Sequence, residues 1–251
     1  MSALQLHPLP GLPEIGAGVD LAAAIAAALA HAGLRLEAGD VIAVAQKVVS
    51  KAEGRVVRLA GVTPGERASD FARITGKDPR YVEVVLRESI RVVRAVPGVL
   101  IVEHRLGHVM ANAGIDQSNV PGEDRVLLLP ADPDASAAAL REQIAARCGV
   151  APAVLVTDSF GRPWRQGVVG VALGVAGLAA LEDRRGRRDR DGRVLRMTQV
   201  AVADALAAAA VLAMGEGDEG TPVVLARGVP GKRRDATVRE LFRRGEEDLF
   251  R

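Results

Sequence analysis

The chain has 251 residues, of which 49% are hydrophobic and only 2% aromatic, so its core must be largely aliphatic. Its 33 Lys and Arg residues nearly balance its 31 Asp and Glu residues, which argues against a polybasic protein that binds nucleic acid. One cysteine allows no internal disulfide, and no apolar run reaches the roughly 20 residues of a membrane-spanning helix. We therefore expect a cytoplasmic protein with neither a membrane nor a nucleic-acid partner.

The first half of the chain predicts one buried strand among several helices. Asp20 is a suitable N-cap for an Ala-rich helix over residues 21–32, which Gly33 would end. The run of small and β-branched residues over 41–45 is typical of a buried strand. Further helices are expected over 64–75 and 79–89, and further strands over 4–6, 92–96 and 99–103.

A polar segment, residues 46–55, follows the predicted strand 41–45 directly. Lys47 and Lys51 in this segment are accompanied by Ser50 and Gly54. Lysines at the end of a buried strand indicate an anion site, but solvated lysines on an amphipathic segment fit the spacing equally well. The spacing alone leaves both interpretations open.

Two polar segments look like functional loops. Asn112–Pro121 lies between two apolar runs and is rich in groups that offer oxygen ligands and backbone N–H donors. The second segment, residues 158–167, begins with Asp158, which the predicted strand 153–157 would deliver at its end. We interpret the two segments as loops that meet in space.

The second half predicts two long helices, over residues 132–147 and 198–214, and a final strand over 222–227. Four glycines in 167–181 indicate closely packed backbone, in either strand or helix. The acidic, glycine-containing stretch 215–222 would end the second helix. We expect one domain over residues 1–251, with 231–251 as a charged tail that forms a short peripheral helix.

Two other motifs have a functional and a structural interpretation. His104 and His108 have the spacing of some zinc sites, but extended surroundings would place the two side chains far apart, so we favour structural roles. The Arg-rich stretch 183–193 could contact nucleic acid. Its interleaved Asp residues favour an exposed loop that pairs with itself.

The chemistry of the two loops points to a metal and a phosphate. Asp116 and Asp158 are hard oxygen ligands on separate segments, which favours Mg²⁺ or Mn²⁺ over structural zinc. Lysines and arginines near them suit phosphate, and no Walker-type motif is present. The residues themselves therefore predict metal-dependent phosphate or nucleotide chemistry, and nothing narrower.

Taken together, the motifs resemble the coenzyme F420-0:gamma-glutamyl ligase family, over about residues 5–228. The matching segments occur in order and are Gly11-Leu12-Pro13, residues 46–55, residues 112–120, residues 158–167 and Met214-Gly215-Glu216. The resemblance is to the form without a fused nitroreductase-like domain.

The resemblance implies an α+β fold of mixed, largely antiparallel sheets with packed helices, which forms an intertwined homodimer, with the stretch 167–181 at the subunit interface. It also implies a GTP-dependent ligase that adds L-glutamate to F420-0, giving F420-1 and then further gamma-linked glutamates. The reaction would pass through an acyl phosphate and release GDP and phosphate. The implied cofactors are two Mg²⁺ or Mn²⁺ ions, with K⁺ as a further candidate.

Site residues carry over position by position. The metal ligands would be Asp116, Asp158, Ser159 and Glu216. Nucleotide-contacting positions would be Leu12, Pro13, Glu14, Ile15, Gln46, Lys47, Lys51, Asn119, Met214, Gly215, Glu216, Gly217, Asp218 and Glu219. By their chemistry, Arg162, Arg165 and Lys51 are candidates for contacting the reacting phosphate or carboxylate.

Two alternatives to this ligase remain at this point. The same metal site could serve an amide ligase that acts on a different phosphorylated carboxylic acid. A protein without enzymatic activity could instead bind nucleic acid through the stretch 184–193, which predicts strongly salt-dependent binding.

Overall fold

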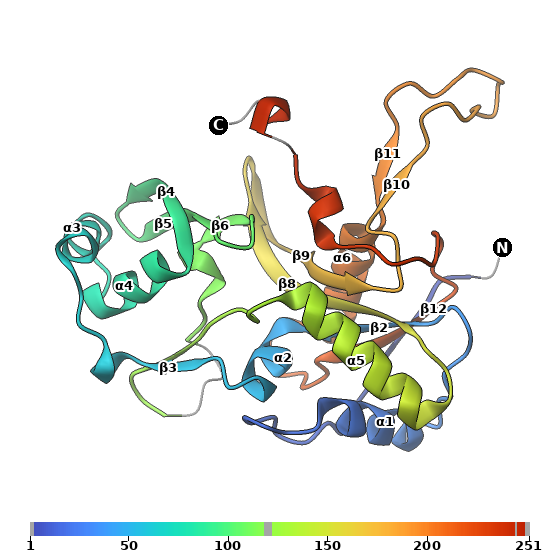
Figure 1. Cartoon of the computed structure of the whole chain (residues 1–251), viewed down its shortest axis with the longest axis horizontal. Coiled ribbons are helices and arrows are strands. Elements are labelled where there is room, and N and C mark those ends of the chain that lie inside the picture. The colour runs from blue at the N-terminus through green and yellow to red at the C-terminus, as the bar shows by residue number, and fades with distance from the viewer. Residues whose placement is uncertain (1–2, 118–121, 244, 249–251) are drawn as a thin grey trace.

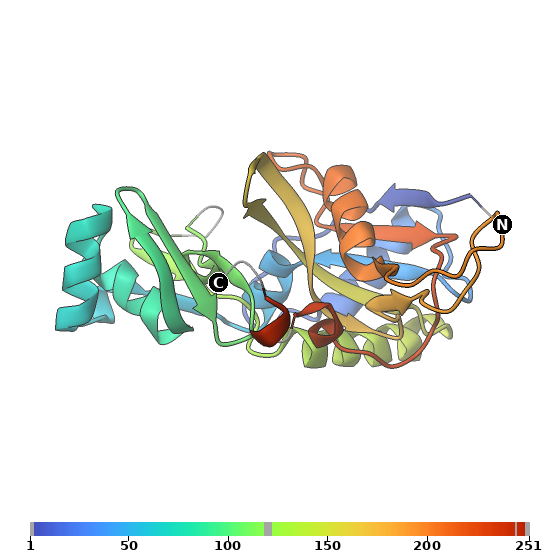
Figure 2. The ribbon, with the colours of Figure 1, turned by 90° about the horizontal axis from the view of Figure 1, so that it is seen from above.

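The computed structural model describes residues 3–117, 122–243 and 245–248. The chain forms a large lobe built on a five-stranded sheet and a small lobe built on a three-stranded sheet (Figure 1). The two lobes also lie side by side when the molecule is seen from above, in Figure 2. The expected α+β class with mostly antiparallel sheets is confirmed.

The strands of the large sheet follow the order β1-β12-β2-β8-β9. Their bounds are β1 (Gln5–Pro8), β12 (Val223–Arg227), β2 (Val41–Ala45), β8 (Ala153–Arg162) and β9 (Arg165–Ala176). Neighbours run antiparallel except β2 and β8, which are parallel and pair Val41 with Ala153 through Ala45 with Thr157. β2 ends at Ala45, opposite Thr157, whereas β8 continues to Arg162 in its hairpin with β9. The candidate site lies where β2 ends, beside residues 157–159 of β8.

Helices cover both faces of the large sheet. Ile42 and Val44 contact the core under α1 (Leu21–His31) and α5 (Pro133–Cys148), whereas Val41 and Ala43 contact the core under α6 (Val202–Met214). This alternation follows from the period of two residues along a strand. Asp20 caps α1 as predicted, because its side chain accepts a hydrogen bond from the Ala23 amide at 2.9 Å.

The glycines of β9 allow both helices to approach the sheet closely. A Cβ atom on Gly170 would lie 2.2 Å from the Ala207 carbonyl oxygen in α6, and one on Gly174 would lie 2.2 Å from the Pro133 carbonyl in α5. The stretch 167–181, for which strand and helix were both open, is therefore a strand through residue 176.

The small lobe consists of α3 (Glu66–Thr75), α4 (Pro79–Arg87) and the antiparallel sheet of β4 (Ser89–Val96), β5 (Val99–His104) and β6 (Val109–Ala111). Its core is aliphatic and includes Val82, Val85, Leu100 and Val102. The chain enters and leaves this lobe through a ribbon in which β3 (Val56–Arg58) pairs antiparallel with β7 (Arg125–Leu127). The small lobe is thus an insertion between α2 (Gln46–Ala52) and α5.

Several predicted boundaries were wrong, mostly where strands pair over long distances. Residues 158–162 belong to β8 rather than to a loop, because they pair with β9 in a hairpin, so Asp158 lies within a strand. Residues 46–52, for which no element was predicted, form the helix α2. The helix expected from residue 198 begins at Val202, because β11 (Gln199–Ala201) pairs with β10 (Leu181–Asp183).

The described part of the C-terminal tail contains only short 3-10 turns, η3 (Val238–Leu241) and η4 (Gly245–Glu247), in place of the expected peripheral helix. Two further 3-10 turns, η1 (Leu59–Gly61) and η2 (Asn112–Gly114), belong to the small-lobe insertion.

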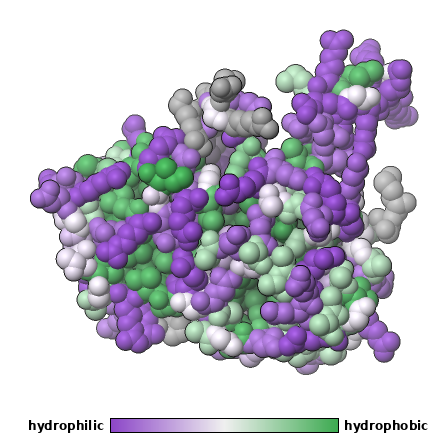
Figure 3. Space-filling view, in the orientation of Figure 1, coloured by the Kyte–Doolittle hydropathy of each residue, from purple (hydrophilic) through white to green (hydrophobic). Residues whose placement is uncertain are grey.

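The Arg-rich stretch projects from the large lobe as an exposed arm between β10 and β11 (Figure 1). Arg184 and Arg187 pair with Glu182 at 3.3 and 3.1 Å, and Arg185 pairs with Asp183 at 2.5 Å. Figure 3 shows the arm covered by hydrophilic residues. These pairs match the expectation of an exposed loop that pairs with itself. Among the described residues, no helix combines the length and apolarity needed to cross a membrane.

Candidate active site

A cleft of about 740 Å³ opens at the edge of the large sheet where β2 ends, beside residues 157–159 of β8. Four segments far apart in the sequence line it, namely residues 12–15, 45–51, 157–159 and 211–222. The predicted site residues that line the cleft are Leu12, Pro13, Glu14, Ile15, Gln46, Lys47, Lys51, Asp158, Ser159, Met214, Gly215, Glu216, Gly217, Asp218 and Glu219. Asn119 lies outside the described residues.

The helix α2 orients the two lysines. Lys47 and Lys51 are four residues apart and so lie on one face of α2, toward the cleft. Gln46 is buried at the start of the helix, and its side-chain oxygen accepts a hydrogen bond from Ser50 Oγ at 2.9 Å. Lys51 Nζ contacts Glu14 Oε1 at 3.0 Å across the cleft wall. Both lysines thus face the cleft and contact carboxylates, so they are not simply solvated, and an anion site at this segment stays a prediction.

Asp116 reaches the cleft from the small lobe. Its Oδ2 atom lies 2.5 Å from Lys47 Nζ, with both side chains only partly exposed. The backbone of Asp116 exchanges two hydrogen bonds with Leu127, at 3.0 and 2.8 Å, which fixes the residue against the ribbon. The ion pair therefore joins the two lobes at the edge of the cleft. Of the two polar segments, Asp116 lies near enough to Asp158 for its charge to affect the pKa of Asp158.

Asp158 is the most perturbed carboxyl group of the site. Its pKa is raised to about 7, chiefly by burial and to a smaller extent by the negative charges of Asp116 and Glu216, which together outweigh the lowering effects of the Ser159 N–H and Lys47. Ser159 Oγ donates a hydrogen bond to Glu216 Oε2 at 3.2 Å. Asp158 is thus close enough to Lys47, Asp116 and Glu216 to be influenced by their charges, and Ser159 links its own segment to Glu216.

The donor set of this site fits a hard divalent cation. Carboxylate and hydroxyl oxygens are the ligands that Mg²⁺ and Mn²⁺ prefer, and a dication would favour the ionised form of the buried Asp158. In this structure the ammonium group of Lys47 contacts the Asp116 carboxylate. Within the part of the chain that the structure describes, no three Asp, Glu, His or Cys side chains are gathered closely enough to form a metal site by themselves.

The acidic loop after α6 closes one side of the cleft. Glu219 folds back and accepts a hydrogen bond from the Gly217 amide at 2.8 Å. A Cβ atom on Gly215, whose φ is +82°, would lie 2.1 Å from the Glu219 carboxyl carbon, so this turn requires glycine. The two glycines therefore allow the loop to hold Glu216 toward Ser159.

Arg162 and Arg165 do not reach this cleft within one chain. They flank the tip of the β8–β9 hairpin beside Trp164, whose side chain is 82% exposed. Arg162 Nη2 donates a hydrogen bond to the nearby Gln166 carbonyl at 3.4 Å. The structure thus separates these two arginines from the other predicted site residues.

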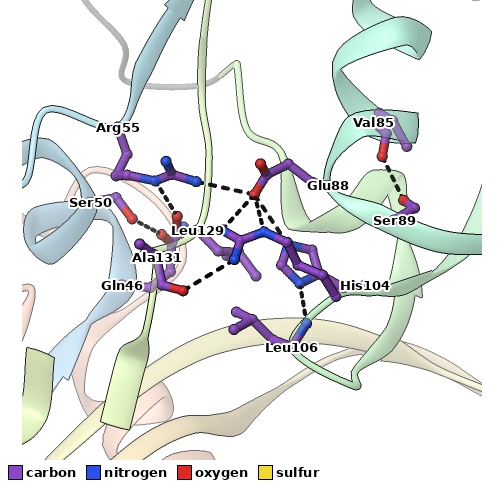
Figure 4. Close-up of polar contacts among 11 residues, drawn as sticks. Gln46, Ser50, Arg55, Val85, Glu88, Ser89, His104, Leu106, Leu129 and Ala131 are labelled. Atoms are coloured by element: carbon purple, nitrogen blue, oxygen red, sulfur yellow. Dashed lines mark hydrogen bonds and ion pairs between the residues drawn. The ribbon is translucent and has the colours of Figure 1, made fainter. Parts of the chain in front are cut away.

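A partly exposed polar cluster that the sequence analysis did not predict lies near α2, where the lobes meet (Figure 4). Glu88 follows α4, and its Oε2 atom lies 3.1 Å from Arg55 Nη2, 3.1 Å from Arg105 Nη2 and 3.6 Å from His104 Nε2. Burial raises the pKa of Glu88, but its contacts with His104, Arg105 and Arg55 outweigh burial and leave the pKa below its usual range. Arg55 Nε also donates to the Leu129 carbonyl at 2.9 Å, so the cluster ties the small lobe to the segment after α2.

The two histidines have structural surroundings. His104 is fully buried, and its Nδ1 atom accepts a hydrogen bond from the Leu106 amide at 2.9 Å. His108 packs edge-on against Phe160 of β8 and Phe242 of the tail, with ring centroids 5.7 and 4.9 Å away. Burial, with a smaller effect of His104, lowers the pKa of His108 to about 4. Its ring is therefore neutral at physiological pH.

Known proteins resemble the chain over almost its full length. Residues 11–228 match the model of a family described as F420-0:Gamma-glutamyl ligase. The chain is 46% identical over 250 residues to the coenzyme F420:L-glutamate ligase of Methanothermobacter thermautotrophicus, covering 99% of each chain. It is 46% identical over 258 residues to the protein of the same name from Methanopyrus kandleri, covering 100% of this chain and 99% of that one. For the Halobacterium salinarum protein, also so named, identity is 48% over 254 residues, covering 99% and 96%.

Proposed function

The chain belongs to the F420-0:gamma-glutamyl ligase family and is a ligase, and on this premise we propose that it joins L-glutamate to coenzyme F420-0 with GTP as the phosphoryl donor. The observation that carries the proposal is the cleft in which Lys47 lies between carboxylates of the two lobes. Such a site can bind a polyphosphate and a cation together.

The proposed reaction has two steps. A carboxylate oxygen of F420-0 attacks the γ-phosphorus of GTP, the bond to the bridging oxygen breaks, and GDP leaves an acyl phosphate behind. The amine nitrogen of glutamate then attacks the acyl carbon, the carbon–oxygen bond breaks, and phosphate leaves as the amine loses its protons. Binding both substrates side by side makes the second step effectively intramolecular. Repetition on the newly added glutamate would give further gamma-linked products.

We assign the residues according to their position in the cleft. Lys47 and Lys51 would hold phosphate oxygens, and the loop 12–15 with Gln46 would contact the nucleotide. Asp116, Asp158, Ser159 and Glu216 would hold Mg²⁺ or Mn²⁺, with Lys47 released toward phosphate. The metal would neutralise charge on the transferred phosphoryl group. Asp218 and Glu219 offer further oxygen ligands for a cation. A requirement for K⁺ stays a prediction.

We further propose that the active form is a homodimer in which Arg162 and Arg165 of one copy serve the cleft of the other. Their position on an exposed hairpin beside Trp164 supports this, because a projecting hairpin can reach a second molecule. Residues 172–180 are buried within the chain, so they cannot form the subunit interface that was expected over 167–181. Co-expression of Arg165→Ala with Asp158→Asn should restore activity that each variant lacks, because one cleft in each mixed dimer keeps both residues. Two inactive variants that stay inactive together would exclude a shared site.

The decisive experiment is mass spectrometry of the products formed from F420-0, GTP and L-glutamate with Mg²⁺ or Mn²⁺. We expect F420-1 and its longer gamma-linked products, one GDP for each glutamate added, and GDP release that requires both F420-0 and glutamate. Absence of F420-1 under all these conditions would refute the proposal. A panel of other phosphorylated carboxylic acids tests the alternative acceptor, which would be selected if one of them reacts faster than F420-0.

A further inference from the structure

A second cavity, of about 440 Å³, lies in the small lobe on the other side of Asp116. Lys47 lines the cleft, Asp116 lines the second cavity, and the two side chains contact each other at 2.5 Å. The ion pair is thus the partition between the two spaces. A ligand in the second cavity and a nucleotide in the cleft would meet at this pair, where the proposed reaction needs charge stabilisation.

The second cavity offers one uncompensated cation. Lys77 lines it and is half-buried, and among the described residues its ammonium group has no ion-pair partner. The neighbouring Asp78 is already engaged, because it lies 2.6 Å from Arg80 Nη2 and accepts a hydrogen bond from the Arg80 amide at 2.8 Å. Asp116 is engaged by Lys47. The cavity therefore favours an anionic group near Lys77.

The same cavity also has an acceptor without a donor. Asn112 lines it, and its side-chain oxygen is buried and receives no hydrogen bond from any residue that the structure describes. An unsatisfied buried acceptor is costly and is usually paired by protein, water or ligand. A ligand with an N–H group would satisfy it after a small rotation of the amide.

The backbone that carries Asn112 and Asp116 is held in an unusual conformation. Asn112 and Ala113 have φ values of 52° and 54°, a left-handed region that few residues other than glycine adopt, and Gly114 follows at 65°. Gly114 packs against Met110 and Leu129 so closely that a Cβ atom would lie 2.6 Å from Met110 Cε. Backbone strain of this kind is commonly found at functional sites, where it presets side chains.

We propose that the second cavity binds the amino-acid substrate, with a carboxylate on Lys77 and the amino group directed to Asn112 and the Asp116 side of the cavity. The inference rests on the proposed function. An unpaired cation and an unpaired acceptor in one cavity match an amino acid, which carries both a carboxylate and an amine.

The test compares Lys77→Gln with wild type in steady-state ligation, varying L-glutamate, F420-0 and GTP separately. We expect KM for glutamate to rise roughly tenfold or more, as for loss of one charge-assisted contact, whereas KM for GTP and for F420-0 stay within about threefold. Lys77→Arg should recover much of the affinity for glutamate because it keeps the charge. Lys232→Gln, which removes an exposed lysine of the tail outside both cavities, is the matched control.

The outcomes separate this inference from the proposed function. If wild type makes no F420-1, the proposed function fails. If wild type is active but Lys77→Gln leaves KM for glutamate unchanged, or raises KM for F420-0 instead, the amino-acid assignment is overturned while the ligase assignment stands. Should Lys77→Gln fail to fold, KM for glutamate can be measured with Lys77→Met, which removes the proposed contact to the carboxylate, and with Asn112→Ala, which removes the proposed contact to the amino group.

Discussion

The Glu88 cluster gives a quantitative test of how the two lobes are held together. Replacing Glu88 by Gln keeps the shape of the side chain but removes the charge that Arg55 and Arg105 contact at 3.1 Å. The substitution therefore leaves two guanidinium groups at the lobe junction without their shared carboxylate. We expect a clear loss of stability from this one change.

The size of the loss follows from exposure. Hydrogen bonds to charged groups contribute about 1.5–3 kcal/mol each, and solvent screening reduces this for Arg55 and Arg105, which are 23% and 38% exposed. A total of about 2–3 kcal/mol is reasonable, because Gln can still accept one hydrogen bond. For a chain of this size that corresponds to a fall in Tm of about 4–12 °C.

The measurement is thermal unfolding of wild type and Glu88→Gln at neutral and at acidic pH. Because the pKa of Glu88 is lowered, its contribution is present at neutral pH and is lost as pH falls through the glutamate range, so the two proteins should converge in acid. Asp70→Asn, which breaks an exposed pair with Arg73 in the same lobe, is the control and should change Tm little. A Glu88→Gln protein that melts no earlier than this control would refute the reasoning.

Three further predictions follow from other contacts. Asp158→Asn and Asp116→Asn should each lower turnover at least about 100-fold, judged by GDP release. Asp158→Asn should leave Tm unchanged or raise it, because the substitution removes a buried charge. Full activity in either variant would rule out the two-lobe metal site. The pKa of His108 is about 4 in the folded protein and about 6.5 in the unfolded chain, so protonation at low pH favours unfolding. As pH falls from 7 to 4, the free energy of unfolding of wild type should decrease by up to about 3 kcal/mol relative to His108→Leu, measured by denaturant titration. Gly174→Ala should cost about 3 kcal/mol, because the new Cβ meets backbone 2.2 Å away, whereas Gly61→Ala, with nothing within 4 Å, should be nearly neutral.

Most residues of the cleft could be predicted from the sequence, because their residue types alone indicate metal or phosphate binding. Asp116, Asp158 and the two lysines of α2 were identified by residue type and by their place after buried strands, and the structure brings them together. Sequence could not decide whether Lys47 and Lys51 were solvated, because that depends on α2 packing beside β8. The extension of β8 past Asp158 was missed for a similar reason, since strand pairing is set by a partner segment and not by local composition.

The remaining parts of the site depend on contacts between distant segments. Lys77 gave no signal in the sequence, because its role depends on Asn112 and Asp116, which lie more than thirty positions away. Glu88 was taken as part of a helix end, and only the fold brings Arg55 and Arg105 to it. Arg162 and Arg165 were chosen by charge alone, which does not specify the direction of a hairpin.

The ribbon that joins the lobes has a consequence for how the family can diversify. The chain leaves the large lobe at Arg55 and returns at Leu128, whose amide donates to the Arg55 carbonyl at 3.0 Å. A segment whose two ends meet in this way can be exchanged by recombination as one unit, or cassette, because the backbone of the large lobe keeps its path. Residues 56–127 carry Lys77, Asn112 and Asp116, whereas the residues that line the cleft belong to the large lobe. Under the proposed assignment of the two cavities, swapping this cassette between relatives would change which amino acid is joined while the phosphoryl donor stays the same.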